Sequence, residues 1–272
     1  MSARPELSVV IVAWRSRDEV LACLESLRRH VRLPYQAIVV DDGSGDGTPA
    51  AVAARFPDAV LVAKSRNEGL VAGRNSALER VRGRLVLMLD ADTEVLPGAV
   101  ETLAGELERS PEVGLVGPRL VYPDGRVQLS CRRYPSLALP FLRRGPYARL
   151  NPDPTPHRRH LMKDFDHARG RPVVWVAGAA QMWRAELPGL IGPYDRNLSS
   201  YGGEDHDWCL RVWAAGLEVR YVPEATIVHV WQQLTRRSLY GRKSQRALRD
   251  FYYLQWKHRG LRKASRLREA QL

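Results

Sequence analysis

Two aspartates one residue apart follow a short apolar run, Leu85–Leu89, and give this chain its strongest chemical signal. A run this short and apolar predicts a buried strand of a covered parallel sheet. Asp90 and Asp92 then lie at the C-terminal end of the strand, where open α/β sheets bind ligands. Carboxylates this close repel each other unless a cation lies between them, and hard divalent ions prefer oxygen ligands. The pair predicts a metal site that holds a phosphorylated ligand; a helix cap at Asp92 is the alternative.

Two other predicted strands end in polar loops. Asp41 and Asp42 follow Ala37–Val40, and Asn67 follows Val60–Ala63. Because the C-terminal ends of parallel strands meet at one edge of a sheet, we expect the three loops to line one crevice. An aspartate at position 41 or 42 can accept hydrogen bonds from ribose hydroxyls or from a pyrimidine N–H, while a tight glycine-rich turn is the alternative interpretation. A nucleoside at one loop and a metal-bound diphosphate at another fit one elongated ligand.

The elements that hold these loops alternate along the first 110 residues. Apolar runs predict strands, and capping residues followed by helical periodicity predict helices. This alternation is typical of right-handed crossovers and a mainly parallel α/β sheet flanked by helices. The expected strands are 7–14, 37–40, 60–63 and 85–90, with helices from about 17, at 48–55, at 71–81 and at 99–108.

After residue 110 the pattern changes to short strands, a long loop rich in proline at 134–156, and a helix that starts near residue 203. Loops of this length often form lids or bind ligands. We expect one catalytic domain at 1–233, with a nucleotide-binding half at about 7–110 and an acceptor half at about 111–233. A basic helical extension covers 234–272. The short strands are expected at 113–117, 120–122, 127–130, 173–177, 218–222 and 226–230.

The composition, 44% hydrophobic and 26% charged over 272 residues, is ordinary for a globular protein. No apolar run approaches the ~20 residues that cross a bilayer, and the N-terminus has no signal-peptide core. Cys23, Cys131 and Cys209 are odd in number and far apart, which indicates free thiols. We therefore expect a cytoplasmic protein, with peripheral attachment to the inner face of the plasma membrane as an option and a homodimer as one possible assembly.

The net charge of +12 is concentrated in residues 236–272, which hold twelve basic and two acidic residues. Basic residues interleaved with aromatic ones suit an interfacial helix on anionic lipid. A solvated helix packed on the body is the alternative. Binding to nucleic acid is not expected, because no RNA- or DNA-binding motif accompanies the charge.

Several motifs occur in an order that resembles glycosyltransferase family 2, the inverting enzymes with the GT-A fold, and most of all their rhamnosyltransferase-like, cell-envelope branch. The resemblance covers about residues 7–231. Its motifs are Asp41-Asp42-Gly-Ser-Gly, Asn67-Glu-Gly69, Gly73-Arg74-Asn75, Asp90-Ala-Asp92, Gly178-Ala-Ala180, Glu204-Asp205-His-Asp207 and Pro223-Glu-Ala-Thr-Ile-Val-His229.

The resemblance implies a donor sugar, rhamnose among the candidates, linked to UDP or dTDP, and an acceptor hydroxyl on a glycan or lipid-linked molecule. It implies donor contacts from one group of residues, a Mg²⁺ or Mn²⁺ ion bound by a second, and an acceptor site formed by a third. Asp205 matches the general base of the family. The donor group is Asp41, Asp42, Asn67, Arg74, Asp90 and Gly178; the metal group is Asp92, together with Asp90, and His229; the acceptor group is Glu204 and Asp207.

The chemistry of these residue types agrees with that picture. An acceptor hydroxyl is a poor nucleophile, and a carboxylate at a helix start, such as Asp205, can take its proton. Its alternative role is a favourable interaction with the helix dipole. A sugar-phosphate nucleotidyltransferase is a second interpretation, but it needs a glycine-rich loop after the first strand, and Trp14-Arg-Ser-Arg-Asp18 is not one. A non-catalytic basic membrane-binding protein is a third, and it leaves the acidic loops unexplained.

Overall fold

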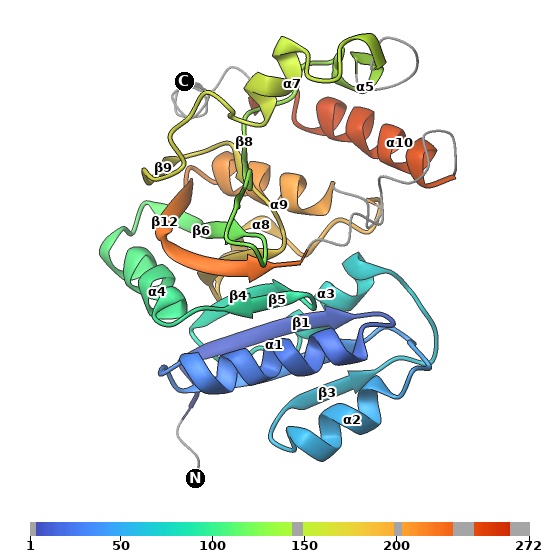
Figure 1. Cartoon of the computed structure of the whole chain (residues 1–272), viewed down its shortest axis with the longest axis vertical. Helices are drawn as coiled ribbons and strands as arrows, with labels where there is room; N and C mark the ends of the chain where they lie inside the picture. Colours follow the sequence, from blue (N-terminus) through green and yellow to red (C-terminus); the bar gives the residue numbers. More distant parts are fainter. Residues whose placement is uncertain (1–3, 143–148, 199–202, 231–241, 262–272) are drawn as a thin grey trace.

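The computed structural model describes residues 4–142, 149–198, 203–230 and 242–261 (Figure 1). Its N-terminal part alternates strands and helices close to the predicted bounds. Short β-branched apolar runs form the strands, and polar loops separate them from the helices. The elements are β1 (Leu7–Ala13), α1 (Arg17–His30), β2 (Tyr35–Asp41), α2 (Thr48–Arg55), β3 (Val60–Ala63), α3 (Leu70–Leu78), β4 (Leu85–Asp90), β5 (Thr93–Val95) and α4 (Ala99–Arg109).

The C-terminal part departs further from the predicted elements. Two predicted pairs of short strands each form one long strand, β6 (Val113–Val121) and β12 (Glu218–His229), and the register of β12 shifts between Val222 and Thr226. The predicted loop contains α5 (Leu139–Leu142) and the start of α7 (Thr155–His160). The remaining elements are β7 (Val127–Gln128), β8 (Cys131–Arg132), β9 (Arg171–Pro172), β10 (Trp175–Val176), β11 (Ala180–Arg184), α8 (Leu187–Ile191), α9 (Glu204–Ala214) and α10 (Arg242–Lys257).

Among the described residues, one sheet runs through both predicted halves in the order β3-β2-β1-β4-β11-β6-β12-β5. Strands β1 to β4 pair in parallel, as their crossovers require, and β6 and β12 are also parallel. Between these groups lies β11, antiparallel to β4 and β6, a strand that the sequence pattern did not reveal. Strand β11 therefore joins the two groups of parallel strands. It also places the residues that precede it beside the C-terminal end of β4, where we expect the ligand to bind.

Helices cover both faces of this sheet. Side chains alternate along β1, so that Val9 packs in the cluster that includes Leu24 of α1 and Leu103 of α4, whereas Val10 packs in the cluster of α3 and α9. The result is the α/β arrangement expected, with helix layers on either side of a mainly parallel sheet.

The basic extension is described only at residues 242–261. Its helix α10 packs on the body, because Asp250, Leu254 and His258 are buried, while Trp256 is 63% exposed. The predicted alternative of a helix packed on the body is therefore correct for α10. The rest of the extension lies outside the described residues. None of the described helices combines the length and the apolar character needed to cross a membrane. Cys23, Cys131 and Cys209 are buried free thiols, as expected.

Candidate functional site

The pairing of β5 with β12 brings His229 to the aspartates that follow β4. Thr93 lies opposite His229 in this antiparallel pair, and the N–H of Val230 donates to the carbonyl of Asp92 at 3.0 Å. His229 Nε2 then lies 3.4 Å from Asp92 Oδ1. One ligand atom from each of Asp90, Asp92 and His229 lies within 4.8 Å of the others. Two carboxylates and an imidazole at this spacing fit a divalent cation such as Mg²⁺ or Mn²⁺.

Gln128 orients the imidazole of His229. The side-chain Oε1 of Gln128 lies 2.9 Å from His229 Nδ1, and its amide also donates to the backbone carbonyl of His229. A proton on Nδ1 leaves the lone pair of Nε2 facing Asp92. Gln128 is buried on a two-residue strand, and nothing in the local sequence distinguishes it from a surface glutamine.

The loop after β2 contains two aspartates with different surroundings. Both oxygens of Asp42 accept backbone N–H groups, from Glu68 and Gly69, and Lys64 lies 3.3 Å away. Asp42 therefore positions the neighbouring loop, and the donor contact expected of it stays a prediction. Asp41 accepts one hydrogen bond, from Ser44 N at Oδ2, while its buried Oδ1 has no partner among the described residues.

The loops after β2 and β3 lie in direct contact. A Cβ atom on Gly43 would lie 2.4 Å from the backbone carbon of Arg66, and the φ of Gly43 is +70°. Only glycine allows this approach without strain. The contact holds the exposed Asn67 beside the Asp41 loop, so the two predicted nucleoside loops form one edge.

Arg74 connects the metal cluster to the start of α9. Its guanidinium lies 3.3 Å from Asp90 Oδ1 and 3.5 Å from Glu204 Oε1, and it donates to the carbonyl of Gly178 at 3.1 Å. The side chain of Arg74 is 1% exposed, and the carboxylates of Asp90 and Glu204 balance its positive charge. The contact of Arg74 with the nucleotide stays a prediction. The observed role of this side chain is to join three elements that are far apart in the sequence.

Asp205 occupies the second position of α9 and faces the residues before β11. Its Oδ2 accepts the N–H of Gly178 at 2.9 Å, and its Oδ1 accepts the N–H of His206 at 2.7 Å. A Cβ atom on Gly178 would lie 2.9 Å from Asp205 Cβ, so this approach requires glycine. Register explains the placement, because Ala180 lies opposite Leu89 and Asp90 N donates to the carbonyl of Ala179. Asp205 thus lies close to the metal cluster.

The carboxylate of Asp205 has an unusual proton affinity. Burial, and then the negative charge of Glu204, raises the pKa of Asp205 to about 7. The N–H of Gly178 and the charge of Arg74 offset only part of this rise. Each oxygen keeps lone pairs beyond the one that accepts a backbone N–H. Asp205 can therefore hold or release a proton near neutral pH, as a general base must.

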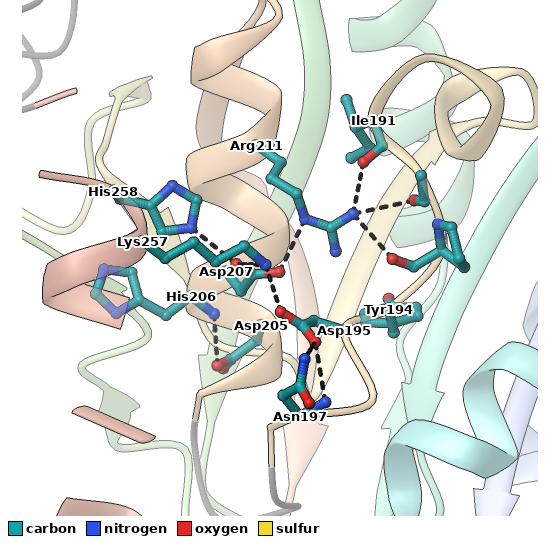
Figure 2. Close-up of polar contacts among 12 residues, drawn as sticks. Ile191, Tyr194, Asp195, Asn197, Asp205, His206, Asp207, Arg211, Lys257 and His258 are labelled. Carbon is teal, nitrogen blue, oxygen red and sulfur yellow. Dashed lines mark hydrogen bonds and ion pairs between the residues drawn. The ribbon is translucent and has the colours of Figure 1, made fainter. Parts of the chain in front are cut away.

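Glu204 and Asp207, the predicted acceptor residues, are both buried, and both bind other groups of the protein. Glu204 pairs with Arg74 and accepts the N–H of Gly203. Asp207 has no exposed surface and lies 2.8 Å from nitrogen atoms of Arg211, Lys257 and His258 (Figure 2). Oxygens of both residues are bound by other groups of the protein, and the acceptor contacts predicted for the two residues stay predictions.

Two solved structures resemble the whole arrangement. The mannosyltransferase PcManGT from Pyrobaculum calidifontis, in complex with GDP-Man and Mn²⁺, superposes with a TM-score of 0.63 at 19% identity over 99% of this chain and 72% of that one. GalNAc-T7 with UDP, GalNAc and Mn²⁺ gives a TM-score of 0.63 at 16% identity, covering 83% of this chain and 43% of that one. At these identities the likeness shows the fold alone, and that fold is GT-A.

Sequence comparison identifies the family. The chain is 29% identical over 237 residues to an N-acetylglucosaminyl-diphospho-decaprenol L-rhamnosyltransferase from Mycobacterium tuberculosis, a match that spans 82% of this chain and 75% of that protein. A succinoglycan biosynthesis protein from Rhizobium meliloti is 31% identical over half of this chain and 41% of its own length. The model named Glycosyl transferase family 2 matches residues 8–170. This chain belongs to glycosyl transferase family 2.

Proposed function

We propose that this enzyme transfers L-rhamnose, with inversion, from a UDP- or dTDP-linked donor to a hydroxyl of a lipid-linked glycan in cell-envelope polysaccharide synthesis. One observation carries the proposal. Arg74 bridges Asp90 to Glu204, and Gly178 contacts both Arg74 and Asp205. The candidate metal cluster and the candidate base therefore lie around the same few side chains, as a sugar bound between a diphosphate and an acceptor requires.

The nucleoside end of the donor fits the loop after β2. Asp41 Oδ1 is buried, has no hydrogen-bond partner in the part of the chain that the structure describes, and lies at the ligand edge of the sheet. A buried carboxylate oxygen without a donor is costly, and an imide N–H of uracil or thymine would satisfy it. The oxygen suits any base with a ring N–H, guanine included, so the choice of uridine or thymidine diphosphate rests on the family resemblance and is decided by the donor panel below; the exposed Asn67 lies beside the same edge.

The cluster of Asp90, Asp92 and His229 would hold the divalent cation. A bound Mg²⁺ or Mn²⁺ supplies a positive charge that offsets the negative charge on the departing diphosphate. Two neighbouring residues position the side chains of this cluster: Gln128 orients the imidazole of His229, and Arg74 pairs with Asp90.

Asp205 would remove the proton of the acceptor hydroxyl while the new bond forms. Its two backbone hydrogen bonds fix the plane of the carboxylate, and its raised pKa makes it a stronger base than an exposed aspartate. A single displacement by the acceptor inverts the anomeric carbon. Retention by double displacement would need a nucleophilic carboxylate at the sugar, and Glu204 is already bound to Arg74 and Gly203.

The proposed acceptor rests on the mycobacterial relative, whose name specifies N-acetylglucosaminyl-diphospho-decaprenol. A lipid-linked acceptor is consistent with the basic extension at 236–272, which we propose attaches the protein to anionic membrane. Flotation with anionic and neutral vesicles tests this attachment. The charged residues should give binding to anionic vesicles that salt weakens, and equal recovery with both vesicle types would contradict it.

The function is tested with a panel of UDP-, dTDP- and GDP-linked sugars, each with and without Mn²⁺. We expect dTDP-L-rhamnose or a UDP-sugar to raise the melting temperature only when Mn²⁺ is present. Transfer is then followed by mass spectrometry with a short-chain N-acetylglucosaminyl-diphospho-lipid, and the anomeric configuration of the product by NMR. Stabilisation by GDP-sugars alone, or a product that retains the donor configuration, would contradict the proposal.

A further inference from the structure

Helix α10 contacts α9 through a buried cluster of charges. Lys257 Nζ and His258 Nε2 each lie 2.8 Å from Asp207 Oδ1, while Arg211 donates to Asp207 Oδ2 at 2.8 Å (Figure 2). Asp207 and His258 are buried, and Lys257 is 24% exposed. The C-terminal extension therefore supplies a cation, Lys257, and a hydrogen-bonding imidazole, His258, to a carboxylate two residues after the candidate base.

Lys257 and two further residues of α10, Tyr253 and Arg249, also bind the segment that precedes α9. Lys257 lies 2.6 Å from Asp195 Oδ2, and Tyr253 donates to the same oxygen at 2.8 Å. Arg249 donates to the carbonyl of Asn197 at 2.8 Å. From α9, Arg211 donates to three carbonyls of the turn after α8, those of Ile191, Gly192 and Pro193 (Figure 2).

The start of α9 rests directly on α10. A Cβ atom on Gly203 would lie 3.5 Å from Asp250 Cβ and 3.5 Å from Leu254 Cδ1. Gly203 immediately precedes α9, whose second residue is Asp205. The position of the candidate base is thus bounded by Gly178 on the sheet side and by α10 behind the helix.

We propose that α10 is a positioning element for catalysis, in which Lys257 and His258 hold the N-terminal turn of α9 so that Asp205 faces the donor. The inference rests on the proposed function of Asp205. It gives part of the basic extension a role that does not involve a membrane: the buried face of α10 positions the base, and the exposed face, with Trp256, is left for other contacts.

The effect has a geometric and an electrostatic part. Without Lys257, Asp207 keeps Arg211 and His258 but loses one cation, and Asp195 loses the same one. A small shift of α9 then misaligns Asp205, and misplacement of a reacting group by about 1 Å can cost ~10²-fold in rate. The less compensated charge of Asp207 also favours protonation of Asp205. The groups that face Asp205 from its surroundings, Glu204, His206, Arg74 and the N–H of Gly178, are unchanged.

The test compares Lys257→Met and Lys257→Arg in the full-length protein. The assay uses the donor selected by the panel and a short-chain acceptor in detergent without vesicles, so that membrane attachment does not enter. We expect Lys257→Met to lower kcat about 10- to 100-fold with little change in the donor KM, and to shift the acidic limb of the kcat profile upward by about half a pH unit. Lys257→Arg should restore most of kcat, because it keeps the charge.

Arg220→Met is the matched control. Arg220 also bridges several carboxylates, those of Glu106, Glu112 and Glu218, but on the side of α4 and away from Asp205. We expect this variant to lose thermal stability while kcat and the pH profile remain those of the wild type. A second variant, Asp207→Asn with Lys257→Met, removes both charges and should recover the acidic limb.

Three results separate the possibilities. A Lys257→Met enzyme that is folded and has wild-type kcat and pH profile would overturn the positioning role. Equal losses of kcat in Lys257→Met and Arg220→Met would also overturn it, since the effect would then be one of general stability. If Asp205→Asn retains full turnover, the proposed function itself fails, which is a different outcome from either of these.

Discussion

The two sides of helix α9 carry aspartates with opposite electrostatic surroundings. Asp205 and Asp207 are two residues apart and both are buried. Asp205 accepts backbone N–H groups, and its pKa is raised to about 7 by burial and by Glu204. Burial also disfavours the charged form of Asp207, but the hydrogen bond from His258 and the charges of Arg211 and Lys257 hold the pKa of Asp207 below its usual range.

This difference teaches that burial alone does not decide what a carboxylate does. The partners of the carboxylate decide it: backbone N–H groups orient Asp205 and leave it able to exchange a proton, whereas Arg211, Lys257 and the hydrogen bond with His258 favour the charged form of Asp207. One helix thus presents the candidate base to the sheet edge and a carboxylate bound by other side chains to α10. A sequence motif with both acids cannot show which is which.

The largest effect expected from this comparison is on turnover. Asp205→Asn keeps the shape, and its one oxygen can accept from either Gly178 or His206, but it removes the base, so kcat should fall about 10²- to 10⁴-fold. Binding of UDP or dTDP with Mn²⁺, measured by calorimetry, should stay unchanged, because the nucleoside loop is on another part of the sheet. Turnover within a factor of two of wild type would show that Asp205 is not the base.

The second expected effect is on the stability of the fold, and here the change at Asp207 should matter more than the change at Asp205. Asp207→Asn leaves Arg211 and Lys257 without this shared counter-charge, and breaking a buried ion pair costs about 3 kcal/mol or more. Urea unfolding monitored by circular dichroism should show this loss, while Asp205→Asn should cost less than about 1 kcal/mol. Equal losses for the two variants would mean that the cations around Asp207 contribute little.

A third carboxylate environment sharpens the comparison. Asp92 faces an imidazole that Gln128 orients, so Gln128→Ala should weaken Mn²⁺ binding about 10- to 100-fold without touching a ligand. Titration calorimetry with Mn²⁺ measures it. Gln36→Ala is the control, because Gln36 donates to the carbonyl of Arg80 outside the cluster. Wild-type affinity in Gln128→Ala would contradict the role given to this residue.

The last expected effect is the pH dependence of stability. Between the unfolded value of about 3.9 and about 7, folded Asp205 retains a proton that the unfolded chain has lost, so its contribution to stability falls as pH rises through this window. Asp207 has the opposite sign: its stabilisation is present above the unfolded value and is lost as pH falls through its lowered folded pKa. Unfolding of Asp205→Asn between pH 4.5 and 8 should lack the decline seen in wild type. An identical decline in both proteins would contradict the assignment.

Much of the N-terminal half could be predicted from sequence because its signals are local. Short apolar runs gave β1 to β4, and the polar loops at their ends, with Asp41, Asn67 and Asp90, lie at one edge because parallel strands require it. The elements of the C-terminal half were harder to predict from the sequence. Strand β11 is antiparallel and central, yet Ala-Gln-Met-Trp-Arg has no alternation, and its pairing with β4 involves residues far away in the chain.

The sequence by itself determined the chemistry that is available: which acids follow which strands, a histidine after the last one, glycines where backbones meet, and a basic C-terminal helix. Only the tertiary structure decided how these groups are used. It paired His229 with Asp92 across β5 and β12, enclosed Arg74 between Asp90 and Glu204, and placed Asp207 against α10. The reason is physical: residue type sets what a side chain can do, but its charge state and its partners depend on contacts between segments that sequence order does not specify.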